Sequence, residues 1–249
     1  GEVICSRTDC KRKAYYRVGD GVFCGYHSNK SERVALPKNP NALEEKMNKI
    51  ALHNAECERI ADENRNNGKR GDVRCAKIRV FGGVDLVPGY VNIFPNFKHL
   101  ERKDGIGMPS LSPMTIGPIK HGQIGLPESL NLENFHQGNK VFPDEVNEKG
   151  AVKKVFFERQ RELYLDAEPH RHKPGFEAKG NIPLFSIWVG KDGKKHKIDY
   201  ITSRQFYCHF YEKSVVENPD FKRLCDMIDQ GYNLMIVGYD GYEVTKSLD

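Results

Sequence analysis

Three polar side chains in segment 131–142 have the types and the spacing of a catalytic group. Glu133, Gln137 and Lys140 stand at positions i, i+4 and i+7, which lie on one side of an α-helix. Two helical turns cover about 10 Å, so all three side chains could reach one small-molecule pocket. A carboxylate, an amide and an amine can supply an acid or base, an orienting hydrogen bond and a nucleophile. The segment therefore predicts a helix that carries a catalytic site.

The same segment has an apolar side, made of Leu132, Phe135 and Phe142, which we expect to hold the helix against a core. From spacing alone, the commoner explanation is an ordinary amphipathic helix whose polar side faces water. The spacing of the residues is compatible with both explanations.

A second group of chemically competent residues is near the N-terminus. Cys5, Cys10, Cys24 and His27 form the pattern C-x4-C-x13-C-x2-H. Three thiolates and an imidazole suit tetrahedral Zn²⁺, and so short a segment needs a metal to fold. We predict one structural zinc site. The competing interpretation is a set of reduced cysteines beside an incidental histidine, and the ligand of the module (DNA, a protein or nothing) stays open.

The other four cysteines are scattered without paired spacing and are expected to be free thiols of a reducing compartment; they are Cys57, Cys75, Cys208 and Cys225. No apolar run approaches the roughly 20 residues that a membrane span requires, and no signal-peptide pattern is visible. We expect an intracellular protein, cytoplasmic or nuclear, without membrane contact.

Composition is that of a globular protein with polar loops. The 249 residues are 38% hydrophobic and 29% charged, and the net charge is +5. Residues 1–80 hold 17 Lys and Arg against 11 Asp and Glu, a net of +6, so the rest of the chain has a net of −1. Any polyanion contact is therefore expected to begin in the N-terminal third, although ordinary solvated lysines explain the excess equally.

Five separated segments, in this order along the chain, resemble the NADAR superfamily, and most closely its branch linked to the DNA ADP-ribosyltransferase DarT. They are Ser110–Pro118 (SLSPMTIGP), Leu132–Phe142 (LENFHQGNKVF), Phe185–Gly190 (FSIWVG), Ser203–Glu212 (SRQFYCHFYE) and Gly238–Tyr242 (GYDGY). Two departures put the pocket shape in question: His136 follows Phe135 where the family often has Trp, and Asn139 replaces a frequent Ser.

The resemblance implies an N-glycosidase that cleaves at ribose C1 and, in this branch, removes ADP-ribose from guanine in DNA. It implies Glu133 and Lys140 as catalytic residues. The substrate-binding residues it implies are Gln137, Ser112, Gly117, Asn134, Trp188, Arg204, Tyr207, Tyr211 and Asp240. No redox cofactor is expected, ADP-ribose being substrate and product. The expected partner is ADP-ribosylated, single-stranded DNA, bound by a monomer.

Two other functions remain open from the sequence. One is a glycosidase of a small N-riboside metabolite, as in other NADAR relatives. The other is a non-catalytic nucleotide- or nucleic-acid-binding protein whose zinc module performs the recognition. Turnover of an ADP-ribosylated guanine substrate separates both from the main hypothesis.

The expected fold class is α+β: a mainly helical NADAR-like domain with short strands, plus a small N-terminal zinc module. The predicted divisions are a zinc-finger-like module at 1–36, a linker and helix at 37–72, and the glycosidase domain at 73–249. The expected elements are a helix from Asn41 to Glu63, a strand at Val73–Phe81, paired strands at Phe185–Val189 and Lys197–Ile201, helices at 203–217 and 218–231, and a strand at Leu234–Gly238.

Overall fold

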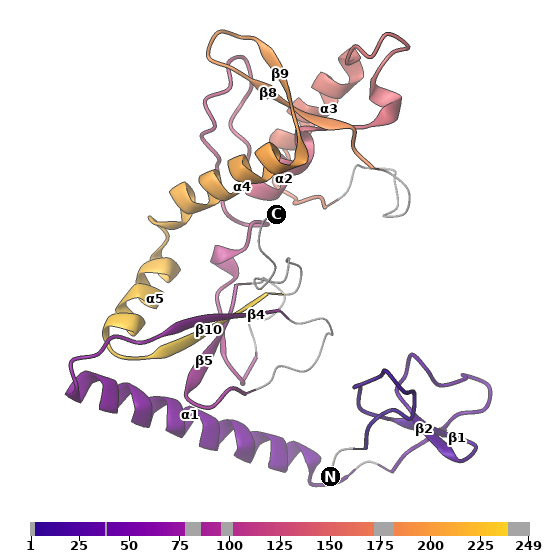
Figure 1. Ribbon diagram of the computed structural model, residues 1–249, viewed down its shortest axis with the longest axis vertical. Coiled ribbons are helices and arrows are strands. Elements are labelled where there is room, and N and C mark those ends of the chain that lie inside the picture. Colours follow the sequence, from indigo (N-terminus) through magenta and orange to yellow (C-terminus); the bar gives the residue numbers. More distant parts are fainter. Residues whose placement is uncertain (1–2, 38, 78–85, 96–101, 172–181, 239–249) are drawn as a thin grey trace. The chain divides into compact units, whose positions relative to one another are not determined.

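A computed structural model describes residues 3–37, 39–77, 86–95, 102–171 and 182–238 (Figure 1). Contacts between residues divide the chain into two units, Gly1–Ala51 and Leu52–Asp249. Helix α1 (Ala42–Asn66) crosses from one unit to the other and confirms the predicted helix from Asn41. The predicted domain limits after residues 36 and 72 stay predictions.

Unit 1 contains a small antiparallel sheet. Its strands are β1 (Tyr16–Val18), β2 (Gly21–Phe23) and β3 (Val34–Ala35), in the order β2-β1-β3. Val18 pairs with Gly21, which leaves a two-residue turn between β1 and β2. Gly19 in that turn has a φ of 56°, a left-handed conformation that glycine adopts without steric cost.

Unit 2 contains a four-stranded parallel sheet. Its strands are β4 (Val73–Lys77), β10 (Asn233–Gly238), β5 (Tyr90–Phe94) and β6 (Ile106–Gly107), in the order β4-β10-β5-β6. The last strand in the chain therefore lies between two early ones, with both neighbours parallel to it. The part of α1 that belongs to this unit is tied to the sheet: the His53 Nε2 atom lies 2.9 Å from the Tyr90 carbonyl oxygen, and Asn64 donates a 2.8 Å hydrogen bond to the Gly231 carbonyl.

A second sheet of unit 2 is antiparallel, with the order β7-β8-β9. Its strands are β7 (Lys140–Val141), β8 (Phe185–Val189) and β9 (Lys195–Ile198). The predicted strand Phe185–Val189 is confirmed and pairs with β9, but the strand predicted at Lys197–Ile201 begins two residues earlier and ends at Ile198, because Asp199 caps a helix that begins at Tyr200. Helix α3 (Lys154–Tyr164) packs on this sheet. The buried contact consists of Val141, Phe156, Ile187 and Val189.

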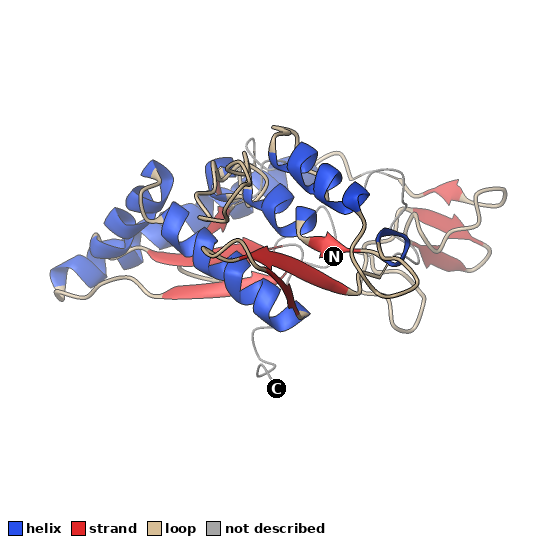
Figure 2. Ribbon diagram, turned by 90° about the horizontal axis from the view of Figure 1, so that it is seen from above, coloured by secondary structure: helices blue, strands red, loops and turns tan. Residues whose placement is uncertain are grey.

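The main core of unit 2 joins its helices to the parallel sheet. The helices are α2 (Leu132–Gly138), α4 (Tyr200–Val215) and α5 (Pro219–Asp229), and two 3-10 turns lie at Pro109–Leu111 (η2) and Pro143–Glu145 (η3). Figure 2 distinguishes these helices from the strands by colour. The buried cluster includes Ile93 of β5, Leu234 of β10, Leu132 and Phe135 of α2, Tyr164 of α3, Phe210 of α4 and Leu224 of α5. α2 is thus a core element, and its packing fixes whatever chemistry its polar side carries.

The expectation of a mainly helical domain is wrong. The described residues contain five α-helices and three sheets, so the fold is mixed and agrees with α+β only in the broad sense. β6 and β7 have two residues each, too few for the alternation by which a strand is recognised in a sequence. Their assignment depends on partners that are distant along the chain.

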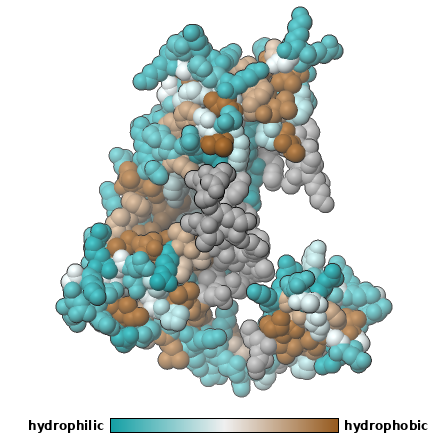
Figure 3. All heavy atoms as spheres, viewed as in Figure 1, coloured by the Kyte–Doolittle hydropathy of each residue, from teal (hydrophilic) through white to brown (hydrophobic). Residues whose placement is uncertain are grey.

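Hydrophobic and hydrophilic residues are mixed over the molecular face shown in Figure 3. None of the described helices combines the length and the hydrophobicity that a membrane crossing requires.

Leu132 and Leu130 provide a matched test of this core. Leu132 is fully buried, whereas Leu130, two residues earlier, is 42% exposed. Leu132→Ala removes buried carbon and leaves a cavity, so we expect the free energy of unfolding to fall by about 2–5 kcal/mol. Leu130→Ala should cost less than about 1 kcal/mol. Urea denaturation measures both, and equal losses would contradict the assignment of α2 to the core.

Candidate functional site

Helix α2 is shorter than the sequence predicts. The side chain of Asn131 caps it by accepting a 2.8 Å hydrogen bond from the Asn134 amide, and the helix ends at Gly138. Glu133 and Gln137 are on the helix, as expected. Lys140 is not: it begins strand β7 and pairs with Ser186 of β8. The predicted single helical row of three residues is therefore wrong.

Tertiary packing explains why the helix ends where it does. Gly138 lies so close to Tyr164 that a Cβ atom there would be 3.0 Å from the tyrosine ring. The next residue, Asn139, accepts a 2.9 Å hydrogen bond at its carbonyl from the amide of Ile187 in β8. The chain thus leaves the helix to join the sheet, and the turn at Asn139 carries Lys140 back toward Glu133.

A buried hydrogen-bond network holds this turn. The Asn139 side-chain oxygen accepts hydrogen bonds from the Tyr164 hydroxyl and, at 3.0 Å, from Gln160. Gln123 donates to the Tyr164 hydroxyl at 3.0 Å and accepts from the Val189 amide at 3.0 Å. Asn139, Tyr164, Gln160 and Gln123 are all buried. Because leaving buried polar groups unpaired is costly, the network fixes the backbone immediately before Lys140.

A buried ion pair supports the other side of Lys140. Arg159 contacts Glu145 at 2.8 Å, and their side chains are only 13% and 2% exposed. The same guanidinium donates a 2.7 Å hydrogen bond to the Lys140 carbonyl, and Glu145 accepts from the Phe142 amide at 3.1 Å. The backbone from 139 to 142 is therefore held at several points, while the Lys140 side chain remains only half-buried.

The carboxylate of Glu133 is buried and has a defined partner. Its residue is 9% exposed, and its Oε1 atom accepts a 3.0 Å hydrogen bond from the Gln137 side-chain amide. This i, i+4 contact confirms that the two side chains share one side of α2. It also orients the carboxylate, because one of its oxygens is occupied by the amide.

Lys140 is electrostatically unusual. Burial lowers the pKa of its amine, and the negative charge of Glu133 opposes that shift only in part. A larger fraction of the amine is therefore neutral near pH 7 than in an exposed lysine. The interaction with Glu133 also establishes that the two side chains lie near each other despite being on different elements.

Helix α4 supplies an aromatic and a cationic neighbour. Burial, followed by the charge of Glu133, raises the pKa of Tyr207, so its hydroxyl stays protonated. The Tyr207 ring lies 4.9 Å from the imidazole of His136, centroid to centroid. Burial lowers the pKa of His136 to about 3, and the positive charges of Lys140 and Arg204 contribute. The structure thus places a neutral histidine, His136, beside the predicted site residues. In the sequence, His136 stands out only because it differs from the tryptophan frequent at this place in the NADAR pattern.

Three of the predicted substrate-binding residues have structural roles. Asn134 is fully buried, and its amide donates to the carbonyls of Asp166 and Glu168 and accepts from the His170 amide. Ser112 accepts a 3.2 Å hydrogen bond from the Met114 amide in a turn. Gly117 packs so closely that a Cβ atom would be 2.0 Å from the Leu130 carbonyl oxygen. Asn134 and Gly117 therefore shape the surroundings of α2.

Of the remaining predicted substrate-binding residues, Trp188 packs against the core, Tyr211 makes a structural hydrogen bond, and Asp240 lies outside the described residues. Trp188 stacks on Phe206 of α4 with a centroid separation of 4.2 Å, which joins β8 to the main core. Tyr211 donates a 2.7 Å hydrogen bond from its hydroxyl to the Leu111 carbonyl. Asp240 and the segment around it lie outside the described residues.

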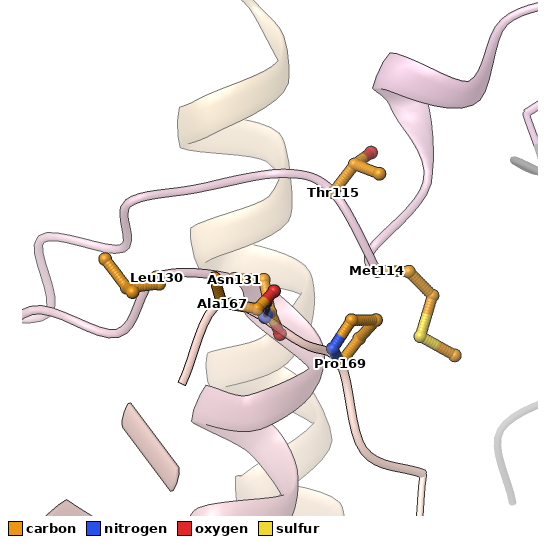
Figure 4. Close-up of a pocket in the computed structure, with 6 residues that line it drawn as sticks. All are labelled: Met114, Thr115, Leu130, Asn131, Ala167 and Pro169. Carbon is orange, nitrogen blue, oxygen red and sulfur yellow. Dashed lines mark hydrogen bonds between the residues drawn. The ribbon is translucent and has the colours of Figure 1, made fainter. Parts of the chain in front are cut away.

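A cavity of about 530 Å³ adjoins the N-terminal end of α2. Its lining is largely apolar and comprises Met114, Thr115, Leu130, Asn131, Ala167 and Pro169. Figure 4 shows Met114 and Pro169 side by side, with Asn131 close to Ala167. The lining residues do not include Glu133 or Lys140, so this cavity is a neighbour of the candidate catalytic group and does not contain it.

The predicted metal ligands of unit 1 come together. The ligand atoms of Cys5, Cys10, Cys24 and His27 all lie within 4.8 Å of one another, and the four side chains could bind a metal ion. The His27 Nδ1 atom is 3.5 Å from the Sγ atoms of Cys5 and of Cys24, and the Cys10 and Cys24 sulfurs are 4.0 Å apart. Tetrahedral bonds of about 2.3 Å to sulfur and 2.0 Å to nitrogen require separations of about 3.8 Å and 3.5 Å. The observed geometry fits that requirement.

The thiol of Cys24 has a lowered pKa. Burial by itself raises its pKa, but hydrogen bonds from the backbone amides of His27 and Tyr26 and from the neighbouring thiols outweigh burial and lower it to about 7. The thiolate is the form that ligates metal. No disulfide is present, and the four other cysteines are free thiols as predicted.

No protein-family model, curated protein or solved structure matches the chain. Its function is therefore argued from its own residues and their geometry.

Metal removal tests the cluster of unit 1. Elemental analysis of the purified protein should find about one metal ion per chain, and Cys24→Ala should lose most of it. We expect a bound metal to supply the folding energy of this small unit, so the variant should lose protease resistance in residues 1–36 and keep it in unit 2. Cys208→Ala, at an exposed thiol, is the matched control. A metal-free wild type with a protected N-terminus would contradict the assignment.

Proposed function

We propose that this protein is an N-glycosidase that removes ADP-ribose from guanine bases in DNA, with Glu133 and Lys140 as the catalytic pair. The observation that carries the proposal is a half-buried amine of lowered pKa beside a buried, oriented carboxylate. The resemblance of five ordered segments to the DarT-linked branch of the NADAR superfamily supplies the reaction class.

The pair suits cleavage of a bond between ribose C1 and a base nitrogen. Such cleavage builds positive charge on the sugar, which a carboxylate stabilises, and the departing base needs a proton. A neutral lysine amine is a nucleophile toward an electrophilic carbon, and desolvation is the usual way to obtain one. Glu133 and Lys140 have these two properties at neighbouring positions.

In the proposed sequence, ring opening first makes C1 an iminium carbon bonded to the guanine nitrogen, which the Glu133 carboxylate stabilises, and the ring oxygen takes a proton from water. The Lys140 amine then adds to C1 and loses a proton to Glu133. That proton passes to guanine as its bond to C1 breaks, which leaves a Schiff base between Lys140 and the ribose. The hydroxide left from that water adds to the Schiff base, releases ADP-ribose and restores the neutral amine. Glu133 ends as the carboxylate with which it began, one water is consumed, and no redox partner is required.

Other residues have supporting roles in this proposal. Gln137 holds one oxygen of Glu133 and leaves the other toward the reacting atoms. Arg204 supplies positive charge on the adjacent helix for the diphosphate of ADP-ribose. The neutral, half-buried His136 and the protonated Tyr207 keep water and further charge away from Lys140. The Asn139 network keeps the lysine in position.

We further propose that the metal of unit 1 is zinc with a structural role. Three thiolates and an imidazole are a ligand set typical of closed structural zinc sites, which keep no position for substrate. The residues that would hold the ion are Cys5, Cys10, Cys24 and His27, and its chemistry there is to fix the fold of a small unit.

Substitution of the pair tests the mechanism. Glu133→Gln keeps size and loses charge, so we expect turnover of an ADP-ribosyl-guanine oligonucleotide to fall by about 100-fold or more, with a modest change in binding. Lys140→Ala should abolish turnover, and the double variant should be little worse than either single variant, because the residues act as a unit. Glu217→Gln and Lys213→Ala, at exposed positions of the same unit, are the matched controls.

Borohydride added during turnover should fix ADP-ribose to Lys140 in the wild type and leave no adduct in Lys140→Ala, as mass spectrometry can show. Because the pKa of Lys140 is lowered, the rate should rise with pH along a limb whose midpoint lies below 10.5, the ordinary value. Robust turnover without a trapped adduct would make Lys140 a binding residue, and near-normal rates in both single variants would move the site elsewhere.

Substrate choice tests the assignment to DNA. ADP-ribosyl-guanine in an unpaired strand should be cleaved faster than in a duplex, because the base must leave the stack to reach a buried carboxylate. ADP-ribosyl-arginine and ADP-ribosyl-glutamate on protein should react far more slowly. Release of free ADP-ribose, measured by liquid chromatography, compares them. Preference for a small free N-riboside would instead favour a metabolite glycosidase.

A further inference from the structure

Unit 1 exposes an aromatic ring beside its metal-binding cluster. Tyr26 stands between two of the ligands, Cys24 and His27, and is 79% exposed. Its ring is held edge-on to the His27 imidazole, 5.2 Å between centroids, and the Arg12 guanidinium lies over it at 5.2 Å from the ring centroid. A tyrosine side chain has a large apolar area, and burying it stabilises a fold. Tyr26 gains little of that stabilisation, because its ring is mostly exposed to water. The ring is thus both exposed and positioned, which a purely structural role does not require.

The loop that carries the first two cysteines is rich in positive charge. Residues 5–13 contain four Lys or Arg and one Asp. Arg7, Lys11 and Arg12 are exposed, and within the described parts of the chain none of them forms an ion pair with an acidic side chain. With a divalent ion bound, three thiolates leave the cluster at a net charge of about −1, which these cations exceed. The surface beside Tyr26 therefore attracts anions.

An exposed ring among cations matches one ligand chemistry in particular. Unpaired bases stack on aromatic side chains while their phosphates contact Lys and Arg, and every base has a face to offer. In a duplex those faces are covered by the neighbouring base pairs. An acidic peptide would use the charges and leave the ring without a partner.

We propose that Arg7, Lys11, Arg12 and Tyr26 form a binding surface for single-stranded DNA, with an unpaired base on the Tyr26 ring and phosphates on the three cations. The choice of DNA over RNA rests on the proposed function of unit 2. The surface gives unit 1 a task beyond holding a metal ion: it binds the strand that carries the modified guanine.

The opposite face of the small sheet provides an internal control. A Cβ atom on Gly25, beside Tyr26, would lie 3.7 Å from the Tyr16 ring, and the Arg33 guanidinium is 4.1 Å from the centroid of that ring. Arg17 is the next residue of β1, so its side chain projects from the other face, where its register partners are Val22 and Val34. Arg17 is exposed, like Arg12. The two arginines can be neutralised separately with the same change in net charge.

The test is fluorescence anisotropy of a labelled 12-nucleotide single strand without ADP-ribose, titrated with the metal-bound full chain. Tyr26→Leu should weaken binding about tenfold, whereas Tyr26→Phe, which keeps the ring, should bind like the wild type. Arg12→Gln should lower the slope of log K against log salt by about 0.7, the value for one lost contact to a single strand. Arg17→Gln should leave affinity and slope unchanged.

Metal content, measured for every variant, separates loss of the surface from loss of the fold. The proposal is overturned if Arg12→Gln and Arg17→Gln weaken binding equally, if Tyr26→Phe binds as poorly as Tyr26→Leu with its metal retained, or if hexaglutamate or a matched RNA strand competes as well as DNA. It is also overturned if the wild type does not bind the strand.

Cleavage of free ADP-ribosyl-guanosine distinguishes this proposal from the proposed function. Tyr26→Leu should cleave that small substrate at the wild-type rate, because the substrate has no strand to stack. If the wild type binds the strand as described and cleaves no ADP-ribosyl-guanine, the proposed function fails and the binding surface stands.

Discussion

Burial of Asn139, in the turn between α2 and β7, is the constraint on which the candidate site depends. The Asn139 side-chain oxygen accepts hydrogen bonds from the Tyr164 hydroxyl and the Gln160 amide, both deep in unit 2. Because an unpaired amide there would cost on the order of 1–3 kcal/mol, the turn has one favourable arrangement. That arrangement ends α2 and sends the next residue, Lys140, into a strand. The position of Lys140 is thus fixed by polar groups of the surrounding core.

Burial shifts the pKa values of neighbouring groups of this site in opposite directions. It lowers the pKa of Lys140 and of His136, because it disfavours their charged forms, and it raises the pKa of Tyr207. The amine gains nucleophilic character while the imidazole and the phenol remain neutral. Burial therefore favours the neutral forms of all three groups, and Gln137 holds the nearby Glu133 carboxylate by a hydrogen bond. The core packing of α2, through Leu132 and Phe135, is what buries these groups.

The two units solve different physical problems. Unit 2 has sheets, helices and a buried core large enough to hold polar groups in position. Unit 1 has three strands of two or three residues, and four side chains that could bind a metal ion lie together in it. A unit held by a metal needs few side chains for packing, so Tyr26 and the cations of its loop can stay exposed. The two proposals, catalysis by unit 2 and strand binding by unit 1, agree with this division.

The sequence by itself predicted the four residues that lie together and could bind a metal ion, the long helix from Asn41, the strand Phe185–Val189, and the shared side of α2 that carries Glu133 and Gln137. Each of these depends on local spacing: the short intervals between the cysteines and the histidine, a hydrophobic period of 3.6 or 2 residues, or an i, i+4 contact. The reaction class and the role of Lys140 remain predictions. Tertiary structure decided the end of α2, the two-residue strands, the parallel sheet with β10 between β4 and β5, and the neutral His136. These depend on partners up to about 160 residues apart, such as Leu234 beside Val73, and burial by distant residues leaves no periodic signal in the chain.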